Sequence, residues 1–445
     1  MSRAESFLRA RCARLIYRLQ QLAWALPLVD QAIVSGISFA LSVIVARTCS
    51  KEQLGLYTLG MSVVLFATGI QSAFITTPYT VYSPRVRGPS AHEYAGSTLL
   101  HEVVLSAIAA VMLSGVAWLL SGRRAVYGGD WLLWSLAAAV AFILLREYAR
   151  RVSFSWLQAR NAIAMDACAA AVTLVLILVL WREGLLSAAT VYGAVGCGCG
   201  VAALFWLYTN RHRFDPQLSR VTSDFRRNAS FGKWVLVATL LYSARSEMYP
   251  WLLAKYEGVA ATGMFAACLG IVLLSNPLLI GISNVLGPRA AHTAGTTGGI
   301  RPLRHLVYKA TWLICLSMLP LTIAIVKLAA RLLVLIYGPQ YGGHGAVVAV
   351  LAFSIFVASL ALGFDAGLYA MDQPRAIVNI NLLGLAAALS IGLWLTQRDG
   401  LIGAAYGHLA GNMVVAALKC AWFVVSTRRS QELERITDVL PALTT

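Results

Sequence analysis

The sequence contains few charged residues, and the acidic ones are the scarcer kind. Asp, Glu, Lys and Arg make up 12% of the 445 residues, and Lys and Arg outnumber Asp and Glu by 36 to 19. Soluble globular domains carry about 25% charged and about 45–50% apolar residues, whereas 59% of this chain is hydrophobic and its mean hydropathy is +0.71. Many apolar runs reach the about 20 residues that a helix needs to cross a bilayer. The composition excludes a soluble globular protein and predicts an all-α polytopic membrane protein.

Several enzyme signatures are also missing. The sequence has no phosphate-binding glycine loop, no HExxH, no GxSxG and no run of nearby carboxylates suited to magnesium. We therefore expect no ATP-driven chemistry, no catalytic residues, no metal and no cofactor. The predicted outer loops are short, the largest spanning only 329–343. A membrane glycan ligase or polymerase would be expected to carry a larger outer loop or domain for its acceptor.

The 8 cysteines form no pattern of disulfides or metal ligands. Most fall inside apolar segments, unlike the cysteine framework of a small secreted domain. Cys197-Gly198-Cys199 has no further ligand residues nearby. Small residues that ease helix packing explain this motif better than a metal site does.

The apolar segments predict about twelve membrane-spanning helices. They lie near 25–46, 56–80, 97–120, 131–149, 162–181, 187–208, 233–254, 261–286, 306–327, 345–370, 376–396 and 401–425. Placing both termini and the even-numbered loops on one side puts about 25 of the 36 Lys and Arg residues there, an excess that marks the cytoplasmic side. The net charge of +17 is thus a topology signal, and we expect no nucleic-acid partner.

The N-terminal segment 1–23 predicts a basic amphipathic helix. Apolar residues recur there at helical spacing, with arginines between them. Such a helix lies on the inner membrane surface and attracts anionic lipids. We expect no removable signal peptide, because no short apolar core precedes a small-residue cleavage site.

One stretch of the chain occurs twice. The first copy runs over Asp30–Arg85 and the second begins near Lys233, at a spacing of about 205 residues that is typical of transporters built from two repeated halves. Gly55-Leu56-Tyr57 aligns with Gly263-Met264-Phe265, and Pro84-Arg85 with Pro288-Arg289. The repeat predicts two pseudo-symmetric six-helix bundles, at 24–209 and 233–426. A cytoplasmic linker (210–232) joins them, and a cytoplasmic tail (427–445) follows.

Corresponding prolines mark the second span of each half. Thr77-Pro78 and Asn276-Pro277 occupy equivalent places in the two copies. Proline at membrane depth can free backbone carbonyls and provide a bending point, although simple helix packing would also tolerate it.

Polar side chains line one face of the first span. Gln31, Ser35, Ser38 and Ser42 recur at helical spacing, and Asp30 lies at their cytoplasmic edge. We interpret this stripe as part of a substrate-binding cavity. The alternative is that the serines bond back to their own helix or ease helix contact.

The seventh span carries an arginine at membrane depth. Tyr242, Arg245, Ser246 and Tyr249 share one face, while Glu247 points elsewhere. A guanidinium suits phosphate, and tyrosine suits the face of a sugar ring, so these four are predicted to bind substrate. Asp30 and Arg245 occupy equivalent spans, which predicts a contact between them. The alternative is that Arg245 and Glu247 form ion pairs that pack helices.

Two later spans add candidates. His408, Asn412 and Lys419 share a face of the twelfth span, where Lys419 could instead snorkel to the interface, and Asp365 lies in the tenth. The predicted candidates for binding a coupling proton or sodium ion are Asp365, Glu247 and Asp30. The remaining charges at the ends of spans are predicted to be interfacial: His101-Glu102, Arg146-Glu147 and Asp166.

The motifs resemble those of one family. GLYTLG within Asp30–Gly60, Leu335-Ile-Tyr-Gly-Pro-Gln-Tyr341, and Gly400-Leu-Ile-Gly-Ala-Ala-Tyr406 resemble the polysaccharide flippases of the multidrug/oligosaccharidyl-lipid/polysaccharide exporter superfamily. The resemblance implies two six-helix bundles around a central cavity that opens to each side in turn. It also implies a polyprenyl-pyrophosphate-linked oligosaccharide as substrate, and the bacterial inner membrane as location. Polysaccharide assembly proteins are further candidate partners.

The sequence departs from the related lipid II flippases in one respect. Those proteins carry a cavity arginine next to the aspartate of span 1, whereas Val29 precedes Asp30 here. This leaves Arg245 as the clearest deep cation for a pyrophosphate. Two alternative functions stay open: a cation-coupled multidrug exporter of the same superfamily, and a membrane glycan ligase or polymerase.

Overall fold

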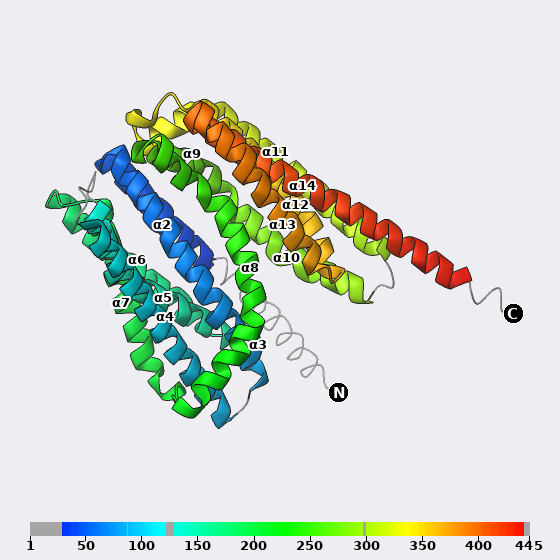
Figure 1. The fold of residues 1–445 in the computed structure, drawn as a ribbon, viewed down its shortest axis with the longest axis horizontal. Helices are drawn as coiled ribbons and strands as arrows, with labels where there is room; N and C mark the ends of the chain where they lie inside the picture. The colour runs from blue at the N-terminus through cyan, green and yellow to red at the C-terminus, as the bar shows by residue number, and fades with distance from the viewer. Residues whose placement is uncertain (1–28, 87, 122–128, 297–299, 440–445) are drawn as a thin grey trace, which may run out of the picture. The chain divides into compact units, whose positions relative to one another are not determined.

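The computed structural model describes residues 29–86, 88–121, 129–296 and 300–439, and within these ranges it contains helices and turns but no β-strand (Figure 1). The predicted all-α fold is confirmed. The predicted interfacial helix over 1–23 and the last residues of the predicted tail lie outside the described residues. The described part of the tail continues the final helix as far as Val439.

Helices form because a chain in hydrocarbon must satisfy its backbone hydrogen bonds internally. The first half contains a helix over Val29–Thr48, α2 (Lys51–Gln71), η1 (Ser72–Thr76), α3 (Thr77–Tyr82), η2 (Ser83–Arg85), α4 (Pro89–Ser121), α5 (Gly129–Ser155), α6 (Ala159–Arg182) and α7 (Ala188–Asn210). The second half contains η4 (Arg211–Arg213), α8 (Leu218–Tyr256), α9 (Val259–Val272), η5 (Leu273–Ser275), α10 (Asn276–Thr296), α11 (Ile300–Tyr337), η6 (Pro339–Tyr341), α12 (Gly345–Ala370), α13 (Pro374–Ala387), η7 (Ala388–Gly392) and α14 (Leu393–Val439).

These helices account for the predicted spans. Ten helices in the described part of the chain are long and apolar enough to cross a bilayer. The last of them, Arg375–Glu432, is interrupted at Gly400, whose backbone (φ 57°, ψ −128°) is not helical, so it holds two predicted spans. α8 contains the further predicted span 233–254.

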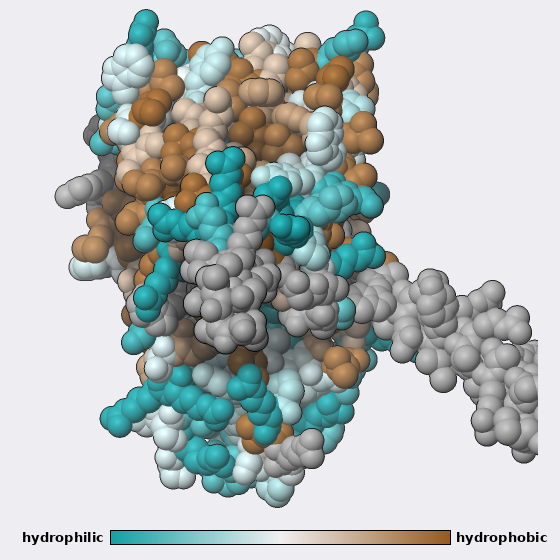
Figure 2. Space-filling model, turned by 90° about the vertical axis from the view of Figure 1, so that its right-hand side faces the viewer, coloured by the Kyte–Doolittle hydropathy of each residue, from teal (hydrophilic) through white to brown (hydrophobic). Residues whose placement is uncertain are grey.

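Many large apolar side chains are exposed along these helices. Val111, Trp118 and Trp312 are 71%, 71% and 73% exposed. Figure 2 shows such apolar residues gathered over parts of one face, apart from patches of hydrophilic ones. Exposed apolar surface of this extent is rare on soluble monomers. It is what helices that face lipid require.

The chain divides into two compact units. Unit 1 holds the chain up to Leu41 and Val63–Leu236, and unit 2 holds Ser42–Ser62 and Val237–Thr445. Within unit 1, α4, α5, α6 and α7 run side by side, and within unit 2 so do α11, α12, α13 and α14 (Figure 1). The boundary thus falls inside α8 rather than in the predicted linker 210–232.

The predicted linker is largely helical and is docked within unit 1. The amide of Asp215 donates to the carbonyl of His92 (3.0 Å), and the hydroxyl of Tyr94 donates to Asn228 Oδ1 (2.9 Å). A Cβ on Gly96 would lie 2.5 Å from the Asp215 backbone, so only glycine permits this approach. These contacts fix the start of α8 against α4.

The C-terminal end of the first helix and the first part of α2 belong to unit 2, and hydrogen bonds hold them there. Arg47 Nε donates to the carbonyl of Ile336 (2.7 Å), which caps the C-terminus of α11. Gln340 donates to the carbonyl of Ala46 (2.6 Å), and the indole of Trp251 donates to Ser62 (2.8 Å).

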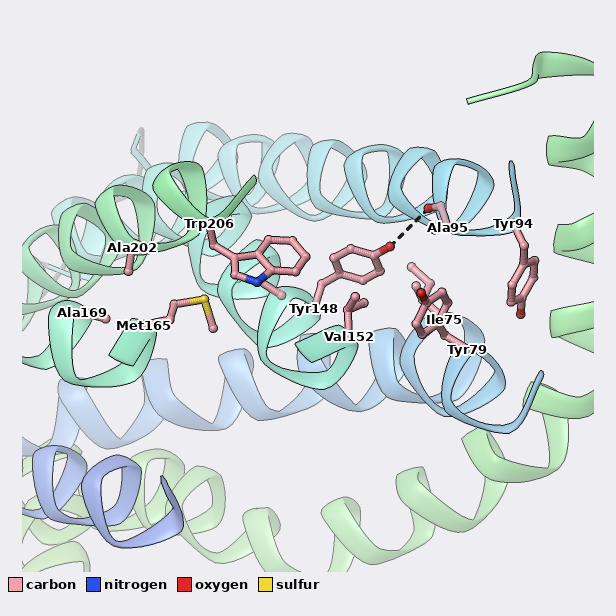
Figure 3. Packing of buried hydrophobic residues seen from close by; sticks show 11 residues of the cluster. Ile75, Tyr79, Tyr94, Ala95, Tyr148, Val152, Met165, Ala169, Ala202 and Trp206 are labelled. Atoms are coloured by element: carbon pink, nitrogen blue, oxygen red, sulfur yellow. Dashed lines mark hydrogen bonds between the residues drawn. The ribbon is translucent and has the colours of Figure 1, made fainter. Parts of the chain in front are cut away.

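Unit 1 has an aromatic core beside its helix crossings (Figure 3). Tyr148 of α5 is fully buried and points toward the carbonyl of Ala95 on α4, to which its hydroxyl donates at 3.4 Å. The indole of Trp206 donates to Ser153 Oγ (2.9 Å). Each polar end of an aromatic residue thus has a partner, as burial requires.

Small residues bring α7 close to its neighbours. A Cβ on Gly196 would lie 2.7 Å from the Cβ of Ala139, and one on Gly198 would lie 2.6 Å from the carbonyl of Ala169. The prediction that Cys197-Gly198-Cys199 serves helix packing is therefore confirmed. The residues that the structure describes contain no group of three or more potential metal ligands.

The two sequence repeats meet at a reciprocal glycine contact within unit 2. A Cβ on Gly55 of α2 would lie 2.0 Å from the carbonyl oxygen of Val259, and one on Gly263 of α9 would lie 2.1 Å from that of Lys51. The same offset of 208 residues relates Gly55 to Gly263 and Lys51 to Val259. Gly55 meets Val259, and the counterparts of these two residues in the other repeat, Gly263 and Lys51, also meet each other. Such a reciprocal pair of contacts is characteristic of a two-fold axis. The predicted repeat therefore has a local symmetric contact.

Both second spans are interrupted just before the predicted proline. A π-helical turn, η1, precedes Thr77-Pro78, and a 3₁₀ turn, η5, precedes Asn276-Pro277. π-turns and 3₁₀ turns within long helices commonly mark functional bends. The structure therefore places a helix irregularity at each predicted bending point.

Candidate functional site

The candidate site in unit 2 lies where α8, α12 and α14 meet. Arg245 of α8 donates through Nη1 to Asn412 Oδ1 (2.8 Å). The Asn412 amide donates to Ser354 Oγ (2.9 Å), and Ser354 Oγ lies 2.8 Å from His408 Nδ1. We call these four residues the Arg245 cluster. They join the predicted candidates of spans 7 and 12 and the serine of span 10 in one hydrogen-bonded chain.

Helix α13 leaves room for the arginine. The Cβ that glycine lacks at Gly384 would lie 3.7 Å from Arg245 Cδ and 2.2 Å from a methyl of Val415. A larger residue at Gly384 would therefore collide with α14 and crowd the stem of Arg245. The guanidinium is half-buried.

An ion pair links α12 to α14 in the same unit. Lys419 Nζ lies 2.7 Å from Asp365 Oδ2, and the two side chains are 9% and 23% exposed. Lys419 is thus buried and paired, so the alternative that it snorkels is wrong. Asp365 Oδ1 has no hydrogen-bond partner among the described residues.

The cations of unit 2 outnumber their carboxylate partners at this site. Lys419 uses Asp365, whereas Arg245 forms no ion pair in the described part of the chain and contacts a neutral amide. Glu247 does not neutralise it, because its described contact is a long bond of 3.4 Å from Ser246. A cation at membrane depth without a counter-ion is costly, and a guanidinium favours phosphate or carboxylate. The arrangement can therefore bind an anion.

The two predicted tyrosines differ in their surroundings. Tyr249 is 1% exposed, and its ring packs against His408 at a centroid distance of 5.6 Å. Glycines at 392 and 407 make space for it, since a Cβ there would lie 2.7 Å from its hydroxyl oxygen and 3.0 Å from its Cε1, respectively. In this structure Tyr249 thus packs between helices, and its predicted contact with a sugar ring stays a prediction. Tyr242 is 60% exposed.

A second group of charges lies in unit 1. Arg150 of α5 donates to Asp30 Oδ2 (2.9 Å) and makes two bonds to Glu147 (2.9 and 3.0 Å). Arg146 donates to Asp166 Oδ1 on α6 (2.9 Å). We call these five residues the Arg150 cluster. Bidentate arginine–carboxylate pairs are the strongest hydrogen-bonded ion pairs available to side chains.

The Arg150 cluster shows where several of the predicted residues lie. Asp30 pairs with Arg150 inside unit 1, and its predicted contact with Arg245, a residue of unit 2, stays a prediction. Asp166 is 3% exposed and both arginines are largely buried within the protein, while the predicted interfacial depth of Arg146-Glu147 and Asp166 stays a prediction. Sequence carried one usable signal: these charges fall at those ends of predicted spans 1, 4 and 5 that the predicted topology puts on one side.

The polar stripe of the first helix bonds mainly within that helix. Gln31 donates to Ser35 Oγ (3.0 Å), and Ser38 donates to the carbonyl of Val34 (3.0 Å). These local bonds match the alternative interpretation of the stripe. All three polar side chains remain half-buried, so some of their surface is accessible.

Replacing Arg150 should destabilise unit 1. Arg150→Ala leaves Asp30 without its partner and removes two bonds to Glu147, and breaking a buried pair costs about 3–5 kcal/mol. We expect a clear fall in the unfolding temperature in detergent. Arg151 is the control, because its side chain is 51% exposed although it also contacts Glu147 (2.8 Å). Arg151→Ala should change stability by about 1 kcal/mol or less; equal losses for the two variants would contradict the assignment.

The fold is that of a polytopic helical membrane protein, and it is shared with several solved transporters. Among solved structures, the fold is similar to a multidrug resistance MATE family transporter of the MOP superfamily, at 14% identity and a TM-score of 0.74, covering 90% of this chain and 96% of that one. It is also similar to the lipid II flippase MurJ, at 9% identity and a TM-score of 0.70, covering 90% and 87%. A MOP superfamily transporter from Pyrococcus furiosus matches at 14% identity and a TM-score of 0.64, covering 92% and 96%.

The chain belongs to a particular family within this class. The family model described as "Polysaccharide biosynthesis protein" matches residues 89–345, more than half of the chain. The predicted membership in a polysaccharide biosynthesis family is thereby confirmed, and the fold is the one seen in the MOP superfamily structures. A comparison with curated protein sequences found no match.

Proposed function

We propose that this protein moves a polyprenyl-pyrophosphate-linked oligosaccharide from the cytoplasmic to the outer leaflet of the bacterial inner membrane. The observation that carries the proposal is Arg245, a guanidinium bonded to Asn412 at 2.8 Å that forms no ion pair with any described carboxylate, although Asp365 acts on it electrostatically. Two comparisons support it: the family is one of polysaccharide biosynthesis, and one similar fold belongs to a lipid II flippase.

The physical task explains the arrangement. A charged sugar headgroup cannot cross hydrocarbon unaided, because burying its polar groups without partners costs many times the thermal energy. A polar path between helices lowers this barrier while the lipid tail stays in the bilayer. Arg245 would bind the pyrophosphate, with Asn412 holding the guanidinium in place. Lys419 would add positive charge, which its ion pair with Asp365 partly neutralises.

Alternating access and ion coupling complete the proposal. The interrupted spans η1–α3 and η5–α10 supply bending points for opening to each side in turn. A proton or sodium gradient would drive the cycle, with no bound cofactor. Among the predicted coupling candidates, Asp30 forms an ion pair with Arg150, and Asp365 forms one with Lys419. Glu247 has no cationic partner among the described residues.

The surroundings follow from the same proposal. Basic cytoplasmic segments, with both termini on that side, would attract anionic lipids and anionic lipid carriers. Polysaccharide assembly proteins would supply and receive the substrate.

The proposal is tested in proteoliposomes. Purified protein is reconstituted with a fluorescent polyprenyl-pyrophosphate oligosaccharide, and its arrival in the opposite leaflet is followed by accessibility to a membrane-impermeant quencher or lectin. We expect protein-dependent translocation that rises with an imposed proton or sodium gradient. Transport of cationic drugs or dyes with no movement of the oligosaccharide would favour a multidrug exporter instead and overturn the proposal.

A further inference from the structure

Unit 1 contains a buried carboxyl group that contacts no cation. Glu102 of α4 is 0% exposed. Its Oε1 accepts a hydrogen bond from Ser106 (3.0 Å), and its Oε2 has no hydrogen-bond partner among the described residues. Asp30, Glu147 and Asp166 each contact an arginine. Glu102 was predicted to be interfacial; the structure shows that it is buried within the protein.

The groups that face Glu102 come from α2 and α5. Gln71, the last residue of α2, contacts the carboxyl, and so does Ser106 from its own helix. From α5, Glu147 and the phenol of Tyr148 act on it electrostatically. The adjacent His101 points away, toward the carbonyl of Val221 (2.9 Å) and the ring of Phe225. The charged neighbour is therefore another acid.

A proton on Glu102 removes an unfavourable buried charge. Its neighbour Gln71 is 0% exposed; the Gln71 Nε2 donates to the carbonyl of Leu144 (2.6 Å), while its Oε1 has no described partner. An ionised Glu102 would place a charge that no described cation contacts in an apolar bundle and leave Oε2 without a donor, which is strongly unfavourable. A neutral Glu102 carries its O–H on that oxygen and is no longer charged.

We propose that Glu102 is the site where this transporter binds its coupling proton, an inference that rests on the proposed ion-coupled transport. In the structure described here the proton resides on Oε2. Glu147 acts on Glu102 electrostatically and its side chain is 17% exposed, so in this proposal the proton enters and leaves along the edge of the Arg150 cluster. No bond other than the O–H bond forms or breaks.

The position of Gln71 couples this proton to helix movement. Gln71 immediately precedes the π-helical turn η1, where the α2–α3 span is interrupted. Bending at η1 would carry the Gln71 amide relative to Glu102, which sits on a different helix. The interaction between the amide and the carboxyl then changes, and with it the affinity of Glu102 for its proton.

The test compares Glu102→Gln with the full-length natural chain in proteoliposomes. The amide mimics the protonated carboxyl, so we expect an unchanged unfolding temperature and unchanged exchange of oligosaccharide without a gradient. Coupling to one proton changes the equilibrium ratio of oligosaccharide between the two leaflets by about tenfold per pH unit of gradient. Transport by the natural chain should depend on this gradient, and transport by the variant should not. Glu183→Gln, an exposed position at the end of α6, is the matched control and should respond as the natural chain does.

Several outcomes separate the two proposals. If transport by the Glu102→Gln variant still rises with the proton gradient, the inference is overturned. It is also overturned if Glu247→Gln loses this dependence on the gradient while Glu102→Gln keeps it. Infrared spectra give a readout independent of transport: the carboxylic acid C=O band of the natural chain should be lost in Glu102→Gln. If the natural chain moves no oligosaccharide but this band is present and shifts with pH, the proposed substrate fails while the proton site stands. Absence of the band overturns the proton site.

Discussion

Arg245→Ala is expected to abolish oligosaccharide translocation while leaving a folded protein in the membrane. Arg245 has a neutral described partner, Asn412, so no described buried carboxylate is stranded when it is removed. A substrate pyrophosphate would instead lose its charge-assisted bonds, at a cost of about 2–5 kcal/mol, or about thirtyfold to several thousandfold in transport rate. Arg245→Lys should recover a small part of the rate, because lysine keeps the charge but not the forked donor geometry.

The control for this experiment is an arginine at the end of another span. Arg182 is exposed in the last turn of α6, and Arg182→Ala should transport at the natural rate. Folding is checked by size-exclusion profile and unfolding temperature in detergent. Normal translocation by Arg245→Ala would remove Arg245 from the site and with it the observation on which the proposed function rests.

The glycine contact between the two repeats predicts a second large effect. Gly55→Ala or Gly263→Ala places a methyl 2.0 or 2.1 Å from a backbone carbonyl oxygen. Backbone cannot rotate away as a side chain can, so α2 and α9 must separate, and overpacking of this kind costs about 1–3 kcal/mol. We expect each variant to lower the unfolding temperature by a similar amount, because the two contacts are related by the local two-fold axis.

The double variant provides the sharper test. Once one methyl has pushed the helices apart, the second meets less resistance, so the combined loss should be smaller than the two single losses together. Gly115→Ala and Gly281→Ala are matched controls, since a Cβ at either position meets nothing within 4 Å. In a helix interior they should be neutral or stabilising by about 0.5–1 kcal/mol. Strict additivity, or losses equal to those of the controls, would contradict the reciprocal contact.

Several elements were predictable because their causes are local. Apolar runs of bilayer length predict the spans, since backbone groups in hydrocarbon must bond within their own helix. Pro78 and Pro277 predict bends, and the irregular turns η1 and η5 lie just before them. Gly55 and Gly263 align in the two repeats, and each proves to contact the other repeat's helix.

The partners of the buried charges were not predictable in the same way. Helical spacing places Asp30, Arg245 and Glu102 on a face of their own helix, but it does not say which neighbour covers that face. Within unit 1, Arg150 covers Asp30, and Gln71 interacts with Glu102. Tyr249 shares a face with Arg245, yet it packs against Gly392 of η7 and Gly407 of α14, which the sequence of α8 does not reveal.

The amino-acid sequence by itself determined that this chain is a helical membrane protein of about twelve spans with an internal repeat and with basic residues concentrated in alternate loops. Periodicity, span length and loop charge are properties of one helix and its flanks. Only the tertiary structure decided which buried charges are neutralised, at Arg150 and Lys419, and which lack a described counter-ion, at Arg245 and Glu102. The physical reason is that the energy of a buried charge depends on groups brought from distant segments, through the rotation and depth of each helix against its neighbours.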